Sequence, residues 1–306
     1  MKKLFTIVVL LINLNVFAQE QFSNYRITQD FSPANDISAI RFDSRGSMWV
    51  ATWFGLYKYE QSKWTPCGPE NVCVQTFFID SHDKKWIGLW AGGLHTSQDG
   101  NTWATVNSAG ALSAVNIVAP GSDSTVWVGD YSKGVLMLNG EQSVKYKSGD
   151  VALGDNSILS IVEGINNQTW FGSYHGLSVF DGKTWKLYNK QNSGLPDNNV
   201  YALATGSKGS IWIGTCKGLA KLSGNSWVVY NKSNSALSSD LILSLATDAK
   251  GNIWVGTNKG LNFFDGKAWK HFTVANSNLM DDRVQAISLY NNAVYIGTSK
   301  GISVFK

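Results

Sequence analysis

Large aromatic side chains recur in one repeated turn of this chain and are its clearest candidates for chemistry. The earlier copies of the turn present the following rings: Trp53 and Phe54, Trp90, Tyr131, and Tyr174 with His175. The later copies present small or basic residues: Cys216 and Lys217, Asn258 and Lys259, and Ser299 and Lys300. Aromatic rings beside polar groups commonly hold sugars or other flat, partly apolar ligands. The pattern predicts a ligand-binding face, unless the rings pack on neighbouring loops and only cover the turns.

Acidic residues form a second column, just before the first strand of most repeats: Asp36, Asp155, Asp197, Asp240, and the pair Asp281 and Asp282. We expect the loops that carry them to share a face with the aromatic turns, which makes Asp155 and Asp197 candidate ligand-binding residues. Such carboxylates could bind a cation or orient the hydroxyl groups of a ligand. In the competing interpretation they cap backbone N–H groups of local turns, as Asp commonly does.

The histidines give no catalytic or metal-binding signature. The four of them fall in different repeats, without the HxxxH or HExxH spacing of a zinc site: His82, His95, His175 and His271. Only His175 is expected on the candidate face, where it could contact a ligand or act in acid–base chemistry. The sequence therefore predicts no catalytic residue, no metal and no cofactor, and it favours a binding protein over an enzyme.

These turns belong to a unit that is repeated seven times. The copy SIWIGTCKGL at 210–219 recurs along the chain around one aromatic anchor per unit: Trp49, Trp86, Trp127, Trp170, Trp212, Trp254 and Tyr295. The anchors are 37 to 43 residues apart. Self-similarity at such a period is the signature of a repeat architecture, and units of about 40 residues with four strands have the size of propeller blades.

The unit around Trp212 shows the expected strands. They are 199–205, 211–215, 219–222 and 227–230, separated by segments rich in Gly, Asn, Asp and Ser. The second strand, IWIG, is apolar at successive positions, which is typical of a strand buried on both faces. Sheets stacked around an axis meet that condition, and the large ring fills the space between two twisted sheets.

The two ends of the chain complement each other. Residues 21–30 resemble the fourth strand of later repeats, whereas the last repeat, 294–305, supplies no fourth strand. An N-terminal strand that completes the last sheet would remove its open edge. We therefore predict an all-β, seven-bladed β-propeller with four antiparallel strands per blade, over a single domain from 19 to 306. Nothing in the sequence supplies an eighth blade.

The first residues resemble a secretory signal peptide over 1–18. Lys2 and Lys3 precede an apolar run at 4–14, and Val16-Phe17-Ala18 offers a cleavage site. The run is shorter than the roughly 20 residues of a spanning helix, although a retained membrane anchor is the alternative. The prediction is a protein exported to the periplasm or the cell surface, with no transmembrane segment after cleavage.

Charge and cysteine content narrow the function classes. The formal net charge of +4 falls to +2 when Lys2 and Lys3 are removed, and no basic run is visible, so nucleic acid is not an expected partner. Among the three cysteines, Cys67 and Cys73 lie in one predicted loop and could form a disulfide in an oxidising compartment, or stay as two thiols. Cys216 has no obvious partner.

The repeat resembles that of the two-component regulator propeller family. The closest copies are GSIWIGTCKGLAKL, GNIWVGTNKGLNFF and NAVYIGTSKGISVF, whereas Ala51, Leu89 and Asp130 depart from the usual Gly or Thr in the first three units. The resemblance covers 22–306. It implies the fold of extracellular sensor domains of hybrid two-component systems in Bacteroidetes-like bacteria, here expected as a stand-alone propeller.

Three functions remain open. The first is an exported, non-catalytic, sensor-like binding protein for a glycan or similar small molecule. The second is a protein–protein interaction platform of a cell-envelope complex. The third is a metal-dependent lyase or hydrolase, similar to the streptogramin lyases, for which His175 and the acidic column would be the available groups. The ligand itself is not predicted.

Overall fold

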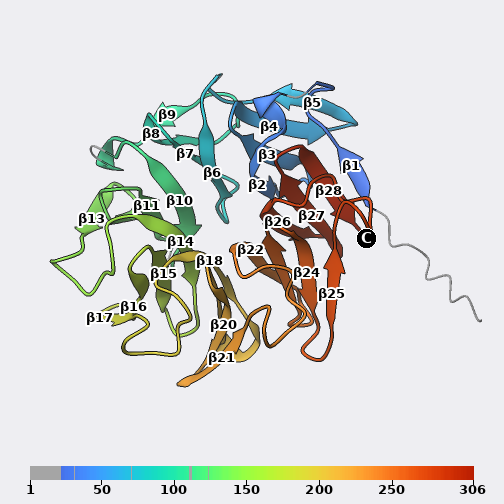
Figure 1. Cartoon of the computed structure of the whole chain (residues 1–306). Coiled ribbons are helices and arrows are strands. Elements are labelled where there is room, and N and C mark those ends of the chain that lie inside the picture. Colours follow the sequence, from blue (N-terminus) through green and yellow to red (C-terminus); the bar gives the residue numbers. More distant parts are fainter. Residues whose placement is uncertain (1–21, 31, 70, 110–111, 123) are drawn as a thin grey trace, which may run out of the picture.

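The chain folds into seven four-stranded antiparallel sheets arranged around a central axis (Figure 1). The structure, a computed structural model, describes residues 22–306 except 31, 70, 110–111 and 123. Each sheet is a blade, and the blades are numbered here from 1 to 7 in the order in which their first strands occur. The predicted seven-bladed β-propeller with four antiparallel strands per blade is confirmed.

The strands of successive blades occupy equivalent places. The innermost strands are β2 (Ile37–Phe42), β6 (Val74–Ile79), β10 (Val115–Pro120), β14 (Ile158–Glu163), β18 (Val200–Thr205), β22 (Ile242–Thr247) and β26 (Val284–Tyr290). The second strands are β3 (Met48–Thr52), β7 (Lys85–Leu89), β11 (Val126–Asp130), β15 (Thr169–Ser173), β19 (Ile211–Thr215), β23 (Ile253–Thr257) and β27 (Ala293–Thr298). The third strands are β4 (Gly55–Glu60), β8 (Gly93–Ser97), β12 (Val135–Asn139), β16 (Gly176–Phe180), β20 (Gly218–Ser223), β24 (Gly260–Phe264) and β28 (Gly301–Phe305). The outermost strands are β5 (Lys63–Pro66), β9 (Ala104–Thr105), β13 (Gln142–Tyr146), β17 (Trp185–Tyr188), β21 (Ser226–Tyr230), β25 (Trp269–Phe272) and β1 (Ser23–Tyr25). Three short 3-10 helices complete the list: η1 (Pro33–Asn35), η2 (Asn107–Ala109) and η3 (Ser207–Gly209).

The N-terminal strand closes the ring, as predicted. β1 pairs antiparallel with β28 in blade 7, with Ser23 opposite Val304 and Tyr25 opposite Ile302. Just before β1, the buried ring of Phe22 packs on Phe272 at 5.7 Å and on Phe305 at 5.5 Å between ring centroids. Blade 7 is therefore built from both ends of the described chain, and its third strand has no free edge.

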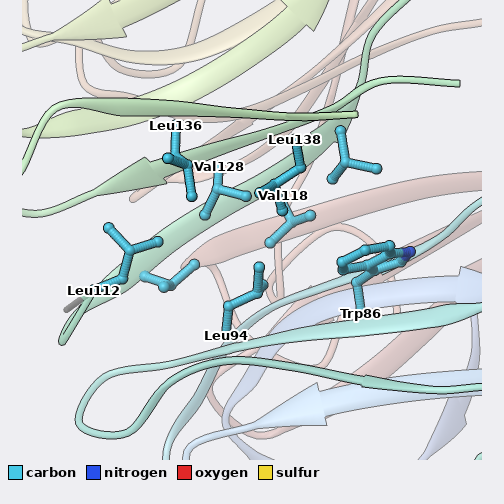
Figure 2. Packing of buried hydrophobic residues seen from close by; sticks show 9 residues of the cluster. Trp86, Leu94, Leu112, Val118, Val128, Leu136 and Leu138 are labelled. Carbon is cyan, nitrogen blue, oxygen red and sulfur yellow. The ribbon is translucent and has the colours of Figure 1, made fainter. Parts of the chain in front are cut away.

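The second strand of each blade is the core of the packing. Six of these seven strands are buried at every position, because a sheet in a propeller is covered by a neighbour on each side. Figure 2 shows one such interface, where Trp86 of blade 2 lies beside Val118 and Leu138 of blade 3. The repeated aromatic anchor thus fills the space between blades.

The glycine of the repeated motif is required by the same close packing. At Gly214 of blade 5, an added Cβ would lie 2.6 Å from Cγ2 of Ile242, the first residue of the next innermost strand. At Gly256 it would lie 2.6 Å from Cγ1 of Val284. In blade 1 the equivalent residue is Ala51, which is fully buried. The looser first repeat therefore keeps the same fold with a methyl group at this contact.

Gly214→Ala should lower the free energy of unfolding by about 1–3 kcal/mol, the usual cost of overpacking a core. The added methyl group would displace Ile242, which is itself fully enclosed. Urea unfolding monitored by tryptophan fluorescence measures the change. The reverse exchange in blade 1, Ala51→Gly, creates no clash and should cost about 0.5–1 kcal/mol. Equal stability of Gly214→Ala and the wild type would contradict the contact.

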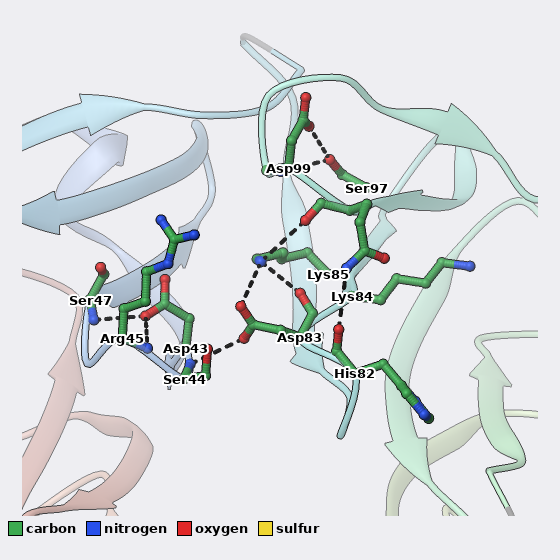
Figure 3. Close-up of polar contacts among 12 residues, drawn as sticks. Asp43, Ser44, Arg45, Ser47, His82, Asp83, Lys84, Lys85, Ser97 and Asp99 are labelled. Atoms are coloured by element: carbon green, nitrogen blue, oxygen red, sulfur yellow. Dashed lines mark hydrogen bonds and ion pairs between the residues drawn. The ribbon is translucent and has the colours of Figure 1, made fainter.

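Polar groups join the blades at the hairpins between first and second strands (Figure 3). The carboxylate of Asp83 in blade 2 accepts a hydrogen bond from the N–H of Ser44 in blade 1 at 3.1 Å, and Nζ of buried Lys85 lies 3.3 Å from it. Burial opposes ionisation of Asp83, but the Ser44 and Lys85 contacts outweigh it and lower its pKa. Asp43 caps its own hairpin and accepts the indole N–H of Trp49 at 2.8 Å. Polar contacts therefore join blades 1 and 2 at this end of the molecule.

Two predictions concern processing and redox state. The predicted signal peptide, 1–18, lies outside the described residues. Within the described part of the chain, no helix is long and apolar enough to cross a membrane.

The disulfide left open above is not formed in this structure, where Cys67, Cys73 and Cys216 are all thiols. Sγ of Cys67 is directed at the carbonyl of Thr65, and Sγ of Cys73 at the side chain of Gln75.

Candidate functional site

The turns between second and third strands share one face of the propeller with the loops between blades. Backbone hydrogen bonds join the two sets directly, from the N–H of Trp53 to the carbonyl of Asp36 at 3.2 Å and from the N–H of Tyr131 to the carbonyl of Ala114 at 2.9 Å. The same bond recurs in blade 2, from Trp90 to Cys73. We call this surface the turn face, and it contains every candidate site residue predicted from the sequence.

Four rings on the turn face form a continuous line, here called the aromatic row. Its members come from blades 2, 3, 4 and 5: Trp90, Tyr131, Tyr174 and Tyr201. Adjacent ring centroids are 5.4, 6.4 and 6.3 Å apart, and each pair meets edge to face. Trp90 is 48% exposed and Tyr131 is 39% exposed. The alternative that the rings only cover the turns explains the contacts among them, but these two keep much of their surface in solvent.

Tyr201 is the member of the row that the turn pattern missed. It is the second residue of β18, where the register with β19 shifts between Val200 and Ala202. Such a bulge re-aims a side chain, and all seven innermost strands carry one at this point. The residues at the equivalent positions are Ser38, Gln75, Asn116, Leu159, Tyr201, Leu243 and Gln285. An aromatic residue there only in blade 5 is the sequence signal that could have identified it.

The hydroxyl groups of Tyr174 and Tyr201 are neutral near physiological pH. Burial, the hydrogen bond with Tyr131 and nearby negative charge, including that of Asp155, raise the pKa of Tyr174 to about 12. Burial, followed by the proximity of Cys216 and Asp197, also raises the pKa of Tyr201. The phenols can therefore both donate and accept hydrogen bonds to a ligand.

A histidine and a carboxylate lie beside the row. Nδ1 of His175 is 2.6 Å from Oδ2 of Asp155, and the His175 side chain is largely exposed. Oδ1 of Asp155 accepts the N–H of Ser157 at 3.1 Å. This fixed pair presents the second ring nitrogen of His175 to solvent next to Tyr174, so it can take part in hydrogen bonds to a ligand.

The same pairing recurs in the later blades with lysine in place of histidine. Nζ of Lys217 lies 3.3 Å from Asp197, and Nζ of Lys300 lies 2.6 Å from Asp281. Burial opposes ionisation of Asp197 and Asp281, but backbone N–H donors and these lysines outweigh it and lower both pKa values. Asp155, Asp197 and Asp281 of the acidic column are thus each paired with a basic side chain of the same blade.

The other acidic residues of the column serve backbone groups or a neighbouring side chain. Asp240 accepts the N–H of Lys232, and Asp282 accepts the N–H of Val274, each at 2.8 Å. Asp36 accepts the side-chain amide of Gln285 in blade 7 at 2.5 Å. No group of three His, Cys, Asp or Glu that could hold a metal ion occurs among the described residues. Asp240 and Asp282 therefore cap backbone N–H groups of nearby turns, as the competing interpretation of the acidic column expects.

Two predicted aromatic residues lie apart from the row. Trp53 is 55% exposed and lines a cavity of about 410 Å³ with Pro33, Asp36 and Lys300, at the junction of blades 1 and 7. Phe54, the next residue, instead lines a cavity of about 210 Å³ with Pro69 and other residues of the loop after β5. The structure therefore divides the predicted column into the aromatic row, the Trp53 cavity and the Phe54 cavity.

The remaining histidines are held by local contacts in other blades than His175. Nε2 of His95 in β8 lies 2.9 Å from the carbonyl of Gly92, and Nε2 of His271 in β25 lies 2.9 Å from the carbonyl of Lys259. His82 is in the β6–β7 hairpin beside the polar network of Figure 3. These side chains do not converge with His175.

The fold and the turn face together define a seven-bladed propeller with one aromatic surface. Three segments of the chain also match a family model. Residues 32–54, 194–217 and 236–259 match the family model described as two component regulator propeller. The chain carries two component regulator propeller repeats, as its motifs predicted. No curated protein matches the chain in sequence.

Solved structures share the architecture at low sequence identity. The extracellular domain of a hybrid two component system of B. thetaiotaomicron superposes with a TM-score of 0.81 at 19% identity, over 94% of this chain and 41% of that one. PorZ, a surface component of the type-IX secretion system of Porphyromonas gingivalis, gives 0.69 at 19% identity, over 89% of this chain and 46% of PorZ. Virginiamycin B lyase of Staphylococcus aureus gives 0.75 at 10% identity, over 93% and 98%. These likenesses concern the fold, and this chain spans less than half of the first two proteins.

Proposed function

We propose that the chain is an exported, non-catalytic binding protein that recognises a glycan or a similar small molecule on the aromatic row. The observation that carries the proposal is the row itself, a line of four rings across blades 2 to 5 with Trp90 and Tyr131 open to solvent. The extracellular location of the similar sensor domain from B. thetaiotaomicron supports export. The predicted signal peptide at 1–18 supports it independently.

The row offers the two kinds of contact that a sugar requires. Apolar C–H faces of a pyranose ring pack on indole or phenol rings, and Trp90 and Tyr131 have such surface available. Hydroxyl groups of the sugar need donors and acceptors, which the neutral phenol of Tyr174 and the pair of His175 and Asp155 supply. Because adjacent rings meet edge to face, a sugar ring would stack on the exposed face of Trp90 or Tyr131, with its hydroxyl groups toward Tyr174 and His175.

Binding to a panel of soluble neutral and acidic oligosaccharides should weaken at least tenfold in the double variant Trp90→Ala/Tyr131→Ala. The loss follows from removing the two most exposed rings of the row, each of which contributes about 0.5–1.5 kcal/mol beyond its buried area. Isothermal titration calorimetry on the chain from residue 19 measures the affinity. Trp53→Ala is the matched control, since it removes an even more exposed ring from an equivalent turn outside the row, and it should change the affinity less than threefold. Unchanged binding in the double variant would remove the row from the site.

A second candidate function is a docking platform for a protein of the cell envelope. The exposed aromatic residues of the turn face favour it, since such rings are enriched in protein interfaces, and the fold is shared with PorZ, a surface component of a secretion system. A photo-crosslinking amino acid placed at Trp90 in the exported protein would capture a partner in cells. Recovery of oligosaccharide ligands without any crosslinked protein would count against the platform.

A further inference from the structure

The inner wall of the propeller carries very little charge. All residues of the seven innermost strands are described, and two of them are charged, Arg41 on β2 and Glu163 on β14. The other side chains of these strands are apolar, or polar and neutral. A lone guanidinium in such a wall calls for a physical explanation.

The hydrogen-bond pattern of blade 1 shows which way Arg41 is directed. The N–H of Asp43 donates to the carbonyl of Ser47 at the end of the β2–β3 hairpin. Hydrogen-bonded and non-hydrogen-bonded pairs alternate along an antiparallel ladder. Counting from that bond, the pair of Ile40 and Val50 is non-hydrogen-bonded, so the carbonyl of Ile40 points away from β3.

That carbonyl points toward the central axis, because β2 is the innermost strand of its blade (Figure 1), and the blades of a propeller surround a central channel. Nη1 of Arg41 donates to it at 2.8 Å. The guanidinium therefore lies at the channel edge of β2. The Arg41 side chain is half-buried, so part of its surface remains accessible.

The charge of Arg41 has no counter-charge in the described part of the protein. Burial lowers the pKa of Arg41, but the ordinary value is so high that the group stays protonated near neutral pH. None of the ion pairs among the described residues includes it. Its one acceptor there is the carbonyl of Ile40, which leaves most of its five N–H donors available. A half-buried charge without a nearby counter-charge is partly removed from water, and an anion that pairs with it would be stabilising.

We propose that Arg41 binds a small oxyanion, a carboxylate or a phosphate, inside the central channel. The planar guanidinium can hold two oxygen atoms of such a group at once. Glu163 is the other charged residue of the innermost strands, and its negative charge would not attract an anion. The channel site is separate from the aromatic row on the turn face and does not depend on the function proposed for that row.

Thermal unfolding with sodium acetate or sodium phosphate, against sodium chloride at equal ionic strength, tests the proposal. At least one of the two anions should raise the melting temperature of the wild type in a saturable way. Arg41→Gln should weaken the apparent affinity at least tenfold. Glu163→Gln should keep or strengthen it, and Arg45→Gln, a change on the hairpin of the same blade, should leave it unchanged. Trp90→Ala/Tyr131→Ala should also leave it unchanged, which separates this site from the row.

Chemical modification of the wild type gives a result that does not require a folded variant. Phenylglyoxal reacts with guanidinium groups, and peptide mass spectrometry after partial reaction reports each arginine separately. Acetate or phosphate should slow modification of Arg41 at least threefold and leave that of Arg45 unchanged. An Arg41 that reacts equally with and without both anions, or is unreactive in every condition, contradicts the proposal. The proposal is also contradicted if neither anion raises the melting temperature of the wild type in a saturable way. The same holds if Arg41→Gln keeps the full response of the wild type.

Discussion

Replacement of Trp212 by alanine should lower the free energy of unfolding by about 3–5 kcal/mol, the usual cost of removing a large ring from a core. Trp212 is buried between blades 5 and 6, where it contacts a cluster that includes Leu219 and Ile242. Its ring lies 5.9 Å from that of Tyr230, and Nζ of Lys221 lies 4.9 Å from its centre. Neighbouring blades are joined by side-chain packing and few covalent links, so a cavity of this size cannot close without moving a whole sheet.

Urea unfolding followed by far-ultraviolet circular dichroism measures the loss without relying on tryptophan fluorescence. Trp53→Ala is the control, because Trp53 is largely exposed and its removal should change stability by no more than about 0.5 kcal/mol. The two variants should therefore separate packing from surface function. A Trp212→Ala protein within 1 kcal/mol of the wild type would mean that the blades do not depend on the aromatic anchor, contrary to the packing seen here.

The fold could be predicted almost completely because its determinants are local and repeated. The sequence predicts strands 199–205, 211–215, 219–222 and 227–230 around Trp212, and the structure has them as β18, β19, β20 and β21 with bounds that differ by at most one residue. Each of seven copies had to bury an apolar strand on both faces and end in a tight turn. The residue pattern that predicts one blade therefore predicts the other six. The extra strand at the N-terminus could pair only with the last blade, which lacked a fourth strand.

The candidate site could be predicted only in part because ring orientation is not a property of the repeat. The turn position predicted Trp90, Tyr131 and Tyr174, whose rings contact one another, but it grouped them with Trp53 and Phe54, which line separate cavities. Whether neighbouring rings meet depends on how far each blade rotates from the last, which no sequence spacing gives.

Residues on the innermost strands were missed for a related reason. Tyr201 and Arg41 look like the half-exposed members of ordinary strands, since nothing in the local sequence says that those strands line a channel. Their significance follows from the ring closure, which brings seven such edges together around one axis. Sequence patterns therefore cannot show which side chains come together when the ring of blades closes.

Removal of the N-terminal strand should produce the largest change in the molecule. In a chain that begins at Ile27, β28 loses its pairing with β1, and the buried contacts of Phe22 with Phe272 and Phe305 disappear. The ring alone contributes about 3–5 kcal/mol, and each lost hydrogen bond about 1 kcal/mol. The free energy of unfolding should therefore fall by at least about 5 kcal/mol relative to the chain from residue 19, as measured by urea unfolding.

The truncation should also change the state of association, because it leaves β28 as an unpaired edge able to pair with a second molecule. Size-exclusion chromatography with light scattering should show dimers or larger species. Phe22→Ala is the matched control: it removes the buried ring but keeps the strand, so it should be destabilised and remain in the association state of the wild type. A synthetic peptide covering 19–27 should restore the lost stability to the truncated protein in a concentration-dependent way. If the truncated protein matched the chain from residue 19 in both stability and association state, the ring would have to be held closed by the packing between blades alone, and the pairing of β1 with β28 would carry no closing function.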